Sequence, residues 1–233
     1  MQMKILAIET STLSGSVAIV EDNGVLCELA LHVEETHSSQ LLPAIQYVLQ
    51  IARLTPDSVD GFAVAVGPGS FTGLRIGMAA VKGLAAAAAK PIIGISTLEA
   101  MAWAFPFSPY PMCPMIDARM KEVYGAWFRA AAGEIERVSE DFVLPPHQLL
   151  KEVKEKTLFF GTGALRYRAE IVDALGEQAL FPPEAIMGAR ASVVGLLAAK
   201  RLQRGDADDL DSIEPLYIRQ AQAIAPRKRR TER

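Results

Sequence analysis

A glycine-rich stretch that follows an apolar run constrains the fold of this chain more than any other part of its sequence. Residues 62–66 read Phe-Ala-Val-Ala-Val, which is typical of a buried strand, and residues 67–77 read Gly-Pro-Gly-Ser-Phe-Thr-Gly-Leu-Arg-Ile-Gly. An alanine-rich segment typical of a helix continues to about Ala89. A strand, a glycine loop and a helix in this order indicate an α/β protein, in which such a junction gathers backbone N–H groups that receive anions and nucleotides.

The composition is that of a globular protein, with 50% hydrophobic and 22% charged residues in a chain of 233. Residues 3–8 are too few for the hydrophobic region of a signal peptide, and no run of about 18 apolar residues occurs. We therefore expect a cytoplasmic protein without a membrane partner. Two cysteines and three histidines without short spacing predict neither a disulfide framework nor a Cys/His metal site.

The net charge of −3 is unevenly distributed along the chain. Residues 226–233 contain five basic residues and one acidic residue, so the rest of the chain carries −7. A basic tail on an acidic body is able to bind RNA through its phosphates, and direct tRNA binding is one hypothesis for this chain. The other interpretation, which we favour, is a solvated and disordered terminus.

The first hundred residues predict a mixed sheet with helices. A turn at residues 22–24 indicates a hairpin, and a helix begins at Ser38 or Ser39 as N-cap and runs through Leu54. The predicted strands are 3–11, 15–21, 25–31, 62–66 and 92–95. Together with the helix after the glycine stretch, they give the order βββαβαβ and a first lobe over residues 1–104.

The second half begins with the proline-rich residues 105–111, which indicate a boundary between lobes. We expect a smaller second lobe over residues 105–225, followed by the basic tail 226–233. Its predicted strands are 113–116, 122–128, 135–138 and 158–160, and its predicted helices are 147–154, 165–174 and 192–204. The expected fold class is therefore α/β, with two lobes that each hold a mixed sheet flanked by helices.

The glycine stretch matches neither of two common phosphate-binding motifs. A P-loop ends in lysine and a hydroxyl residue, whereas Gly73 is followed by Leu74 and Arg75. The stretch also does not match the dinucleotide motif G-x-G-x-x-G, because Gly69 and Gly73 are one residue too far apart. Two interpretations stay open: the glycines bind a phosphate, or they serve only a tight turn and close packing of the helix.

Polar residues at the end of the first predicted strand are weak candidates for a nucleotide site. Glu9, Thr10 and Ser11 offer a carboxylate and two hydroxyls, and Gly69 lies in the glycine loop. A metal and a polyphosphate need ligands from both lobes, for which Asp117 and the glycine turn 161–164 are available. A small phosphotransferase with Glu9 and Asp117 at a metal is thus one hypothesis. The simpler interpretation pairs Asp117 with Arg119 and makes 161–164 a plain turn.

The two helices of the first lobe indicate a protein–protein surface. One stripe of the first helix contains Leu41, Leu42 and Ile45, and a neighbouring stripe contains Tyr47 and Ile51. The second helix places small residues on one face. A helix that is apolar over so much of its circumference needs cover on two sides, from a partner or from its own domain.

Six motifs spread over nearly the whole chain resemble the TsaB family, also called YeaZ. They are residues 8–11, 37–43, the glycine stretch 67–77, 94–99, 117–124 and 215–219. The resemblance implies the two-lobed fold of actin, Hsp70 and the sugar kinases. It also implies a role in making threonylcarbamoyladenosine at position 37 of tRNAs that read ANN codons.

In this family the chain resembles a non-catalytic partner of the larger TsaD, which transfers the threonylcarbamoyl group, and the ATPase TsaE joins them. The resemblance implies that the partner subunits use ATP and a metal ion, that tRNA is reached mainly through the complex, and that two N-terminal helices dock onto TsaD. Without TsaD the same helices could pair two copies of this chain. The residues expected at the contact are His37, Leu41, Leu42, Ile45, Leu74, Arg75, Met78 and Lys82.

The chain departs from the catalytic relative where that relative carries its metal. TsaD has two histidines four residues apart on a helix after the strand that corresponds to residues 92–95, and here those positions hold Thr97 and Met101. A thioether and a lone hydroxyl are poor replacements for two imidazoles. We therefore expect no catalysis, no metal and no cofactor of this chain's own.

Overall fold

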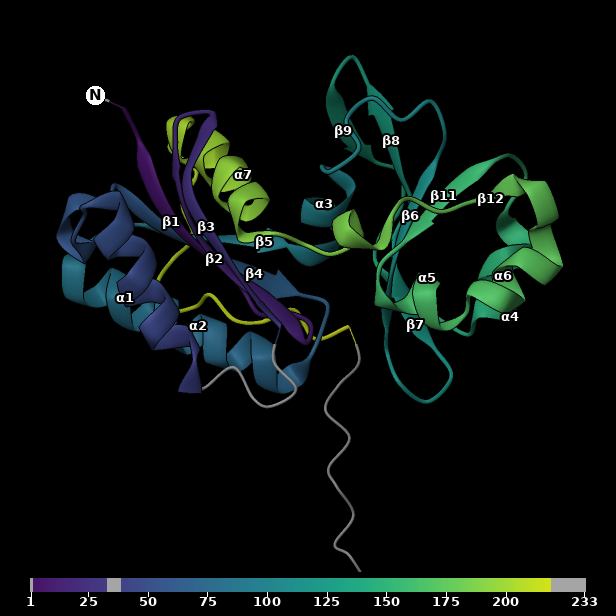
Figure 1. The fold of residues 1–233 in the computed structure, drawn as a ribbon, viewed down its shortest axis with the longest axis horizontal. Coiled ribbons are helices and arrows are strands. Elements are labelled where there is room, and N and C mark those ends of the chain that lie inside the picture. Colours follow the sequence, from purple (N-terminus) through teal and green to yellow (C-terminus); the bar gives the residue numbers. More distant parts are fainter. Residues whose placement is uncertain (1, 33–38, 219–233) are drawn as a thin grey trace, which may run out of the picture.

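The computed structural model has two lobes that lie side by side (Figure 1). It describes residues 2–32 and 39–218. Within these residues no helix is both long enough and apolar enough to cross a membrane.

The first lobe is built on a five-stranded mixed sheet in the order β3-β2-β1-β4-β5. β2 pairs antiparallel with both β1 and β3, whereas β4 pairs parallel with β1, and β5 pairs parallel with β4. The predicted order βββαβαβ is confirmed. The strands are β1 (Lys4–Glu9), β2 (Ser14–Glu21), β3 (Gly24–His32), β4 (Gly61–Gly67) and β5 (Ile92–Ser96).

Two helices, α1 (Leu41–Ala52) and α2 (Phe71–Ala88), cover one face of this sheet (Figure 1). α2 starts at Phe71, because the Ser70 hydroxyl accepts the Gly73 N–H at 3.3 Å and caps the first turn, and its end at Ala88 agrees with the predicted end near Ala89. The predicted cap of α1 is wrong for Ser39, since the N-cap is Gln40 and no side chain caps the helix. Ser38 lies outside the described residues.

The second lobe holds a seven-stranded sheet with the path β10-β7-β6-β11-β12, to which β8 and β9 add a hairpin. The predicted strand 122–128 is two strands, and the predicted helix 165–174 is interrupted at Tyr167. The strands are β6 (Met112–Asp117), β7 (Val123–Gly125), β8 (Phe128–Ala131), β9 (Glu134–Arg137), β10 (Phe142–Leu144), β11 (Thr157–Phe160) and β12 (Ala179–Leu180). The helices are α4 (Pro146–Leu149), α5 (Thr162–Arg166) and α6 (Arg168–Leu175).

The expected second lobe, 105–225, must be corrected at its far end. The last helix, α7 (Ala191–Gln203), packs on the free face of the first sheet and not on the second (Figure 1). Gly195 allows this close approach, because an added β-carbon would come within 2.9 Å of Val20 and 3.1 Å of Ala7. Residues 206–218 also return to the first lobe. The chain thus crosses to the second lobe near residue 105 and comes back near residue 190.

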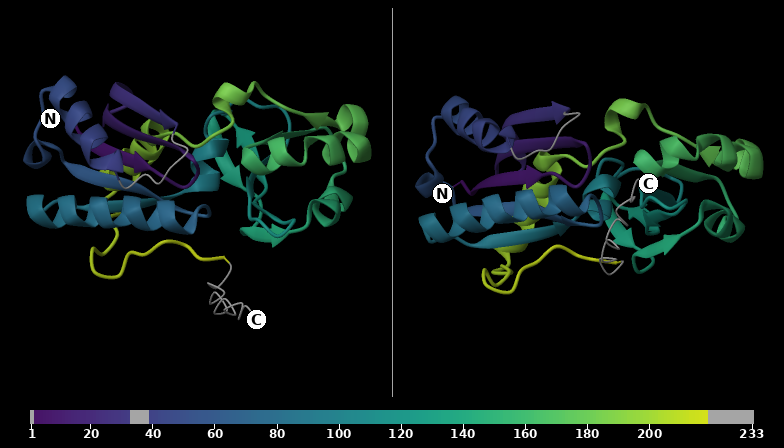
Figure 2. Two further views of the ribbon diagram at one scale, coloured as in Figure 1. Left: turned by 60° about the horizontal axis from the view of Figure 1, so that its bottom comes forward. Right: turned by 90° about the horizontal axis from the view of Figure 1, so that it is seen from below.

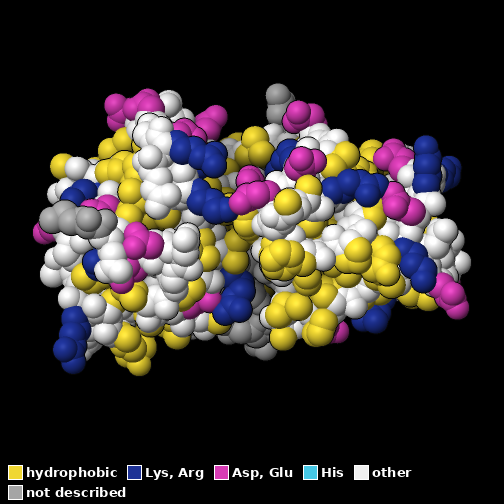
Figure 3. All heavy atoms as spheres, turned by 90° about the horizontal axis from the view of Figure 1, so that it is seen from above, with side chains coloured by type: hydrophobic (Ala, Val, Ile, Leu, Met, Phe, Trp, Pro, Cys, Tyr) yellow, Lys and Arg dark blue, Asp and Glu magenta, His cyan; other side chains and the backbone are white. Residues whose placement is uncertain are grey.

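A short buried helix, α3 (Thr97–Ala102), joins the two lobes. Leu98 and Met101 of α3 pack in one hydrophobic cluster with Met112 and Phe160 of the second sheet. Polar contacts also cross the junction. The Lys200 ammonium lies 3.2 Å from a Glu134 oxygen, and the Arg137 guanidinium donates to the Ser96 hydroxyl at 3.0 Å. Seen from above, charged side chains of both signs lie along the junction (Figure 3).

Candidate functional site

A cleft of about 410 Å³ lies between the two lobes. One wall comes from the turn after β1 and from the start of α2, and includes Ser11, Gly69 and Phe71. The other wall comes from the end of β6 and from α5, and includes Asp117 and Thr162. The sequence thus predicted residues from both walls of the cleft.

The glycine loop packs directly on the end of β1. A β-carbon added at Gly69 would lie 2.4 Å from the Ser11 carbonyl oxygen, and one added at Gly73 would lie 2.1 Å from that of Thr10. The Ser70 N–H donates to the Ser11 carbonyl at 2.6 Å. These contacts are shorter than any real β-carbon contact, so both positions require glycine. Of the two interpretations left open by the sequence, close packing accounts for these glycines.

Glu9 is turned into the protein and does not line the cleft. Its side chain is fully buried, and one carboxylate oxygen, Oε1, accepts both the N–H and the hydroxyl of Ser11. The other oxygen, Oε2, has no hydrogen-bond partner among the described residues. Burial raises the pKa of Glu9 to about 7, and the two bonds from Ser11 only partly oppose this.

Thr10 is also buried, and its hydroxyl donates to the Gly73 carbonyl at 2.8 Å. Of the four nucleotide candidates, only Ser11 and Gly69 therefore line the cleft. Glu9 and Thr10 lie behind the wall of the cleft, where Glu9 binds Ser11 and Thr10 binds the Gly73 carbonyl.

Asp117 is engaged on both of its carboxylate oxygens. One oxygen lies 2.6 Å from the Arg166 guanidinium, and the other accepts the Arg119 N–H at 3.0 Å. The expected ion pair with Arg119 is thus wrong, because the guanidinium that meets Asp117 comes from α5. The Asp117 N–H in turn donates to the Thr162 hydroxyl at 3.2 Å. The glycine turn 161–164 therefore begins α5 and supports Asp117.

The cleft residues do not fit a metal bound to a polyphosphate. Such a metal needs carboxylate oxygens that face the ligand. Glu9 faces Ser11 instead, and Asp117 is tied to Arg166 and to its own loop. In residues 2–32 and 39–218, no group of three or more His, Cys, Asp or Glu side chains gathers at one point.

Thr97 and Met101 lie inside the junction between the lobes. Both side chains are buried, and Met101 packs in the hydrophobic cluster that spans the lobes. The Met101 methyl group lies against Gly161, where an added β-carbon would come within 2.5 Å of it. The two positions that the resemblance compares with metal-binding histidines are therefore part of a packed core here.

Four of the expected partner-binding residues must be corrected. Leu41, Ile45, Leu74 and Met78 are all buried, with at most 5% of their surface exposed. Leu41, Ile45 and Met78 belong to the core between the helices and the first sheet. They are unable to contact a partner directly. A charged substitution at Leu74 or Ile45 would disrupt the fold, and would not test docking alone.

Three large apolar side chains of α1 are exposed. Tyr47 and Ile51, one turn apart, expose 52% and 50% of their surfaces, and Leu42, on another side of the helix, exposes 61%. The neighbouring helix α2 exposes small residues, among them Ala79 and Gly83, and an added β-carbon at Gly83 would meet nothing within 4 Å. We call these exposed residues of α1 and α2 the helix surface. Only Leu42 was among the expected contact residues, although the sequence already placed Tyr47 and Ile51 on a second apolar stripe.

Arg75 and Lys82 are engaged by residues 206–218, which we call the strap. The Lys82 ammonium donates to the carbonyl groups of Asp211 and Ile213 at 3.2 and 3.1 Å. Arg75 donates to the Tyr217 hydroxyl at 2.9 Å. Both side chains therefore hold the chain's own strap. His37 lies outside the described residues.

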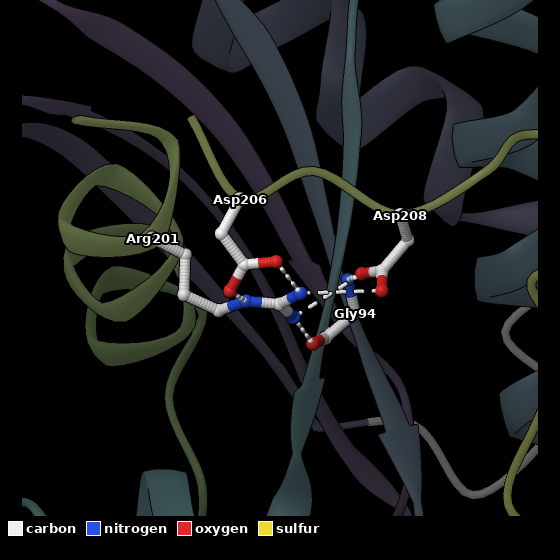
Figure 4. A network of polar contacts seen from close by, with 4 residues as sticks. All are labelled: Gly94, Arg201, Asp206 and Asp208. Carbon is white, nitrogen blue, oxygen red and sulfur yellow. Dashed lines mark hydrogen bonds and ion pairs between the residues drawn. The ribbon is translucent and has the colours of Figure 1, made fainter. Parts of the chain in front are cut away.

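A network around Arg201 anchors the strap to the first sheet (Figure 4). The guanidinium binds both oxygens of Asp206 and of Asp208 and the carbonyl oxygen of Gly94. Asp208 also accepts the Gly94 N–H at 2.7 Å, and its own N–H donates to Ile92 at 2.9 Å. The strap thereby covers β5, an edge strand of the sheet.

Comparison with known proteins places the chain in a family. A model of the family described as "TsaD: tRNA N6-adenosine threonylcarbamoyltransferase" matches residues 8–226. The tRNA threonylcarbamoyladenosine biosynthesis protein TsaB of Bacillus subtilis is 30% identical, over 96% of this chain and 97% of that protein. The protein of the same name from Haemophilus influenzae is 33% identical, over 93% and 94%. The chain belongs to the TsaB family.

Solved structures agree with this TsaB assignment. YeaZ from Pseudomonas aeruginosa has a TM-score of 0.79 and 28% identity, and covers 93% of this chain and 100% of its own. Component A of the (R)-2-hydroxyglutaryl-CoA dehydratase from Acidaminococcus fermentans has a TM-score of 0.52 at 12% identity, over 86% of this chain and 99% of its own, and shares the fold alone. The expected fold class, that of actin, Hsp70 and the sugar kinases, is confirmed, and this TsaB is a tRNA threonylcarbamoyladenosine biosynthesis protein.

Proposed function

We propose that this TsaB is a non-catalytic subunit that docks onto the threonylcarbamoyltransferase TsaD through the helix surface. In this role it acts with TsaD and TsaE in the cytoplasm, where TsaD transfers the threonylcarbamoyl group to adenosine 37 of ANN-decoding tRNAs. The match of this chain to a family model that carries the transferase's name supports a partner of related fold. Because the two proteins would have related lobes, the helices that they present to each other would have similar shapes.

The observation that carries the proposal is the set of exposed apolar side chains on α1. Tyr47 and Ile51 lie one turn apart on one side of the helix and Leu42 lies on another side, and each exposes half or more of its surface. The adjacent α2 offers small residues, which allow the backbone of a partner helix to come close. Exposed apolar side chains gathered on neighbouring elements are typical of a protein–protein interface, whose core is enriched in aromatic residues.

The effect of docking on the transferase is a shift between conformations. A subunit that binds the active state of TsaD more tightly than its inactive state raises the population of the active state. No chemistry by the docked chain is needed for this. The contact requires only that the helix surface be complementary to the active form.

The geometry of the interlobe cleft supports a non-catalytic role over the alternative of a small phosphotransferase. That alternative needs Glu9 and Asp117 at a metal. The Glu9 carboxylate faces Ser11 and is fully buried, and both Asp117 oxygens already accept hydrogen bonds. Nothing in this arrangement favours the phosphotransferase.

Transfer assays with purified subunits test the proposal. TsaD and TsaE with ATP, threonylcarbamoyl-adenylate as donor and tRNA are expected to modify tRNA only when this chain is added. Asp117→Asn is expected to support the same rate as the unchanged chain, because the carboxylate performs no chemistry. ATP hydrolysis by this chain alone that disappears with Asp117→Asn would contradict the proposal and support the phosphotransferase.

A further inference from the structure

The loop between β6 and β7 has a strained backbone. Its consecutive residues Arg119, Met120 and Lys121 have φ angles of 61°, 49° and 64°. This left-handed conformation brings a β-carbon too close to the following carbonyl oxygen, and only glycine adopts it without that cost. Two hydrogen bonds of 3.0 Å close the loop, from the Glu122 N–H to the Arg119 carbonyl and from the Ala118 N–H to the Glu122 carbonyl. We call the three strained residues the left-handed loop.

The side chains of the left-handed loop lie outside the core. All three are exposed, and Met120 exposes 70% of its surface. Glycine at these positions would relieve the strain at little cost in packing, yet the chain has two cations and a thioether there. Strained residues of this kind gather at sites that hold a ligand. Because Arg119 lines the interlobe cleft, the site that the strain indicates is the mouth of this cleft.

Exposed apolar side chains line the opposite wall of the cleft. Leu13, in the turn between β1 and β2, exposes 62% of its surface, and Phe71, in the first turn of α2, exposes 41%. Both line the same cleft of about 410 Å³ as Arg119 does. The first turn of α2 is directed at the second lobe (Figure 2). The mouth of the cleft therefore has an apolar side on the first lobe and a cationic side on the second.

The two cations of the left-handed loop are free to pair with a ligand. Neither Arg119 nor Lys121 forms an ion pair within the described part of the chain, whereas the neighbouring Arg166 is paired with Asp117. Residues 1–218 contain 18 basic and 26 acidic residues, a net charge of −8, and the basic tail follows outside the described residues. Single carboxylates of a partner gain from pairing with these cations, but a long polyanion is repelled by the acidic body.

A protein segment fits this surface better than a nucleic acid or a small molecule. Phenylalanine, methionine and arginine are enriched in protein–protein interfaces, whereas bases stack on rings and gain little from Leu13 or Met120. A small ligand is enclosed by its pocket and gains little from side chains as exposed as these. We therefore propose that the mouth of the cleft binds an acidic segment of a partner protein. The carboxylates of this segment pair with Arg119 and Lys121. Its large apolar side chains pack on Leu13, Phe71 and Met120.

Selection from a displayed library of random peptides tests this inference on the purified full-length chain, without TsaD. The library is first depleted on the double variant Arg119→Gln with Lys121→Gln, which removes peptides that bind the helix surface or any other face. It is then selected on the unchanged chain. We expect the recovered peptides to combine Asp or Glu with Leu, Met or aromatic residues. Recovery of no peptide, or of acidic peptides without large apolar residues, would overturn the inference.

Fluorescence anisotropy with a labelled recovered peptide then separates side chain from backbone. Met120→Gly is expected to weaken peptide binding about tenfold and to raise the urea midpoint of unfolding, because glycine removes the side chain and relieves the strain. Ala132→Gly is the matched control, since Ala132 has a φ of 52° in the exposed turn between β8 and β9. It is expected to raise the midpoint and to leave peptide binding unchanged. Peptide binding by Met120→Gly as tight as that of the unchanged chain would contradict the inference.

Other occupants of the surface are tested with the same double variant. A single-stranded RNA, and vesicles of phosphatidylcholine and phosphatidylserine, are expected to bind the unchanged chain no more tightly than the variant. Binding of either that requires Arg119 and Lys121, with no peptide recovered, would assign the surface to RNA or to a membrane and overturn the inference. Tyr47→Ala is expected to weaken TsaD docking and to leave peptide binding unchanged. The inference and the proposed function therefore fail in different measurements.

Discussion

Gly73 and Thr10 contact each other through both backbone and side chain. The Thr10 hydroxyl donates to the Gly73 carbonyl at 2.8 Å, and the Gly73 α-carbon lies so near the Thr10 carbonyl that an added β-carbon would be 2.1 Å from it. This pair fixes the first turn of α2 on the end of β1. The same turn carries Phe71 and therefore shapes the interlobe cleft.

We predict that Gly73→Ala destabilises the protein, although alanine is the better helix former. The new methyl group would overlap a backbone carbonyl that is held in the sheet, which costs about 2 kcal/mol or more. Gly83→Ala in the same helix is the matched control, because nothing lies within 4 Å of its added β-carbon. It is expected to raise the free energy of unfolding by up to about 1 kcal/mol. Urea unfolding of both variants checks this, and similar effects of the two would contradict it.

Glu9 makes stability depend on pH. In the unfolded chain this carboxyl ionises near its ordinary pKa of 4.5, whereas in the folded protein burial raises the pKa to about 7. Between these values the folded state binds more protons than the unfolded state, so the free energy of unfolding falls as pH rises from 4.5 to 7 and stays lower above that. The full loss is about 3 kcal/mol.

Glu9→Gln is expected to remove this loss. The amide oxygen still accepts from Ser11, and no charge has to be buried. The variant should therefore gain stability over the unchanged protein at pH 8 and differ little from it at pH 4.5. Urea unfolding at both pH values measures this difference. Parallel pH profiles for the two proteins would show that Glu9 does not titrate in this range.

We predict that the Arg201 network keeps the strap bound to the first lobe but is not needed for the rest of the fold. Arg201→Met removes hydrogen bonds to Asp206, Asp208 and Gly94, so amide hydrogens of the strap such as those of Asp208 and Leu216 should exchange faster, by about tenfold. Arg129→Met is the control, since its pair with Glu155 is about half exposed on both sides. Unchanged exchange in Arg201→Met would mean that Ile213 and Leu216 suffice to hold the strap.

The order of elements in the first lobe could be predicted because it depends on local patterns. Alternation and turn residues lie within a few residues of the elements that they define. The position of α7 could not be predicted, because an amphipathic helix does not show which sheet it will cover. Only Gly195 indicates a close approach, and the strands that it approaches are far away in sequence. The strap depends on similar long-range contacts, such as that of Arg75 with Tyr217.

The sequence predicted where the candidate sites lie better than it predicted which side chains are exposed at them. The sequence identified both apolar stripes of α1, but it does not show which stripe the chain's own sheet covers. Leu41 and Ile45 are therefore core residues, and Tyr47 and Ile51 are the exposed ones. Prediction of the interlobe cleft from the sequence meets the same limit. Glu9 stands at the predicted strand end, yet the direction of its side chain is set by Ser11.

The central claim is that the exposed apolar residues of α1 dock onto TsaD, and co-elution from a sizing column tests it most directly. Leu42→Asp and Tyr47→Asp place a charge on the helix surface without touching the core, and each is expected to weaken the complex at least about tenfold. Phe107→Asp is the control, because Phe107 is exposed to 83% and is not part of α1 or α2. The account predicts co-elution of TsaD with the unchanged chain and with Phe107→Asp, and loss of the complex with both helix-surface variants. Undiminished co-elution of folded Leu42→Asp and Tyr47→Asp would contradict it.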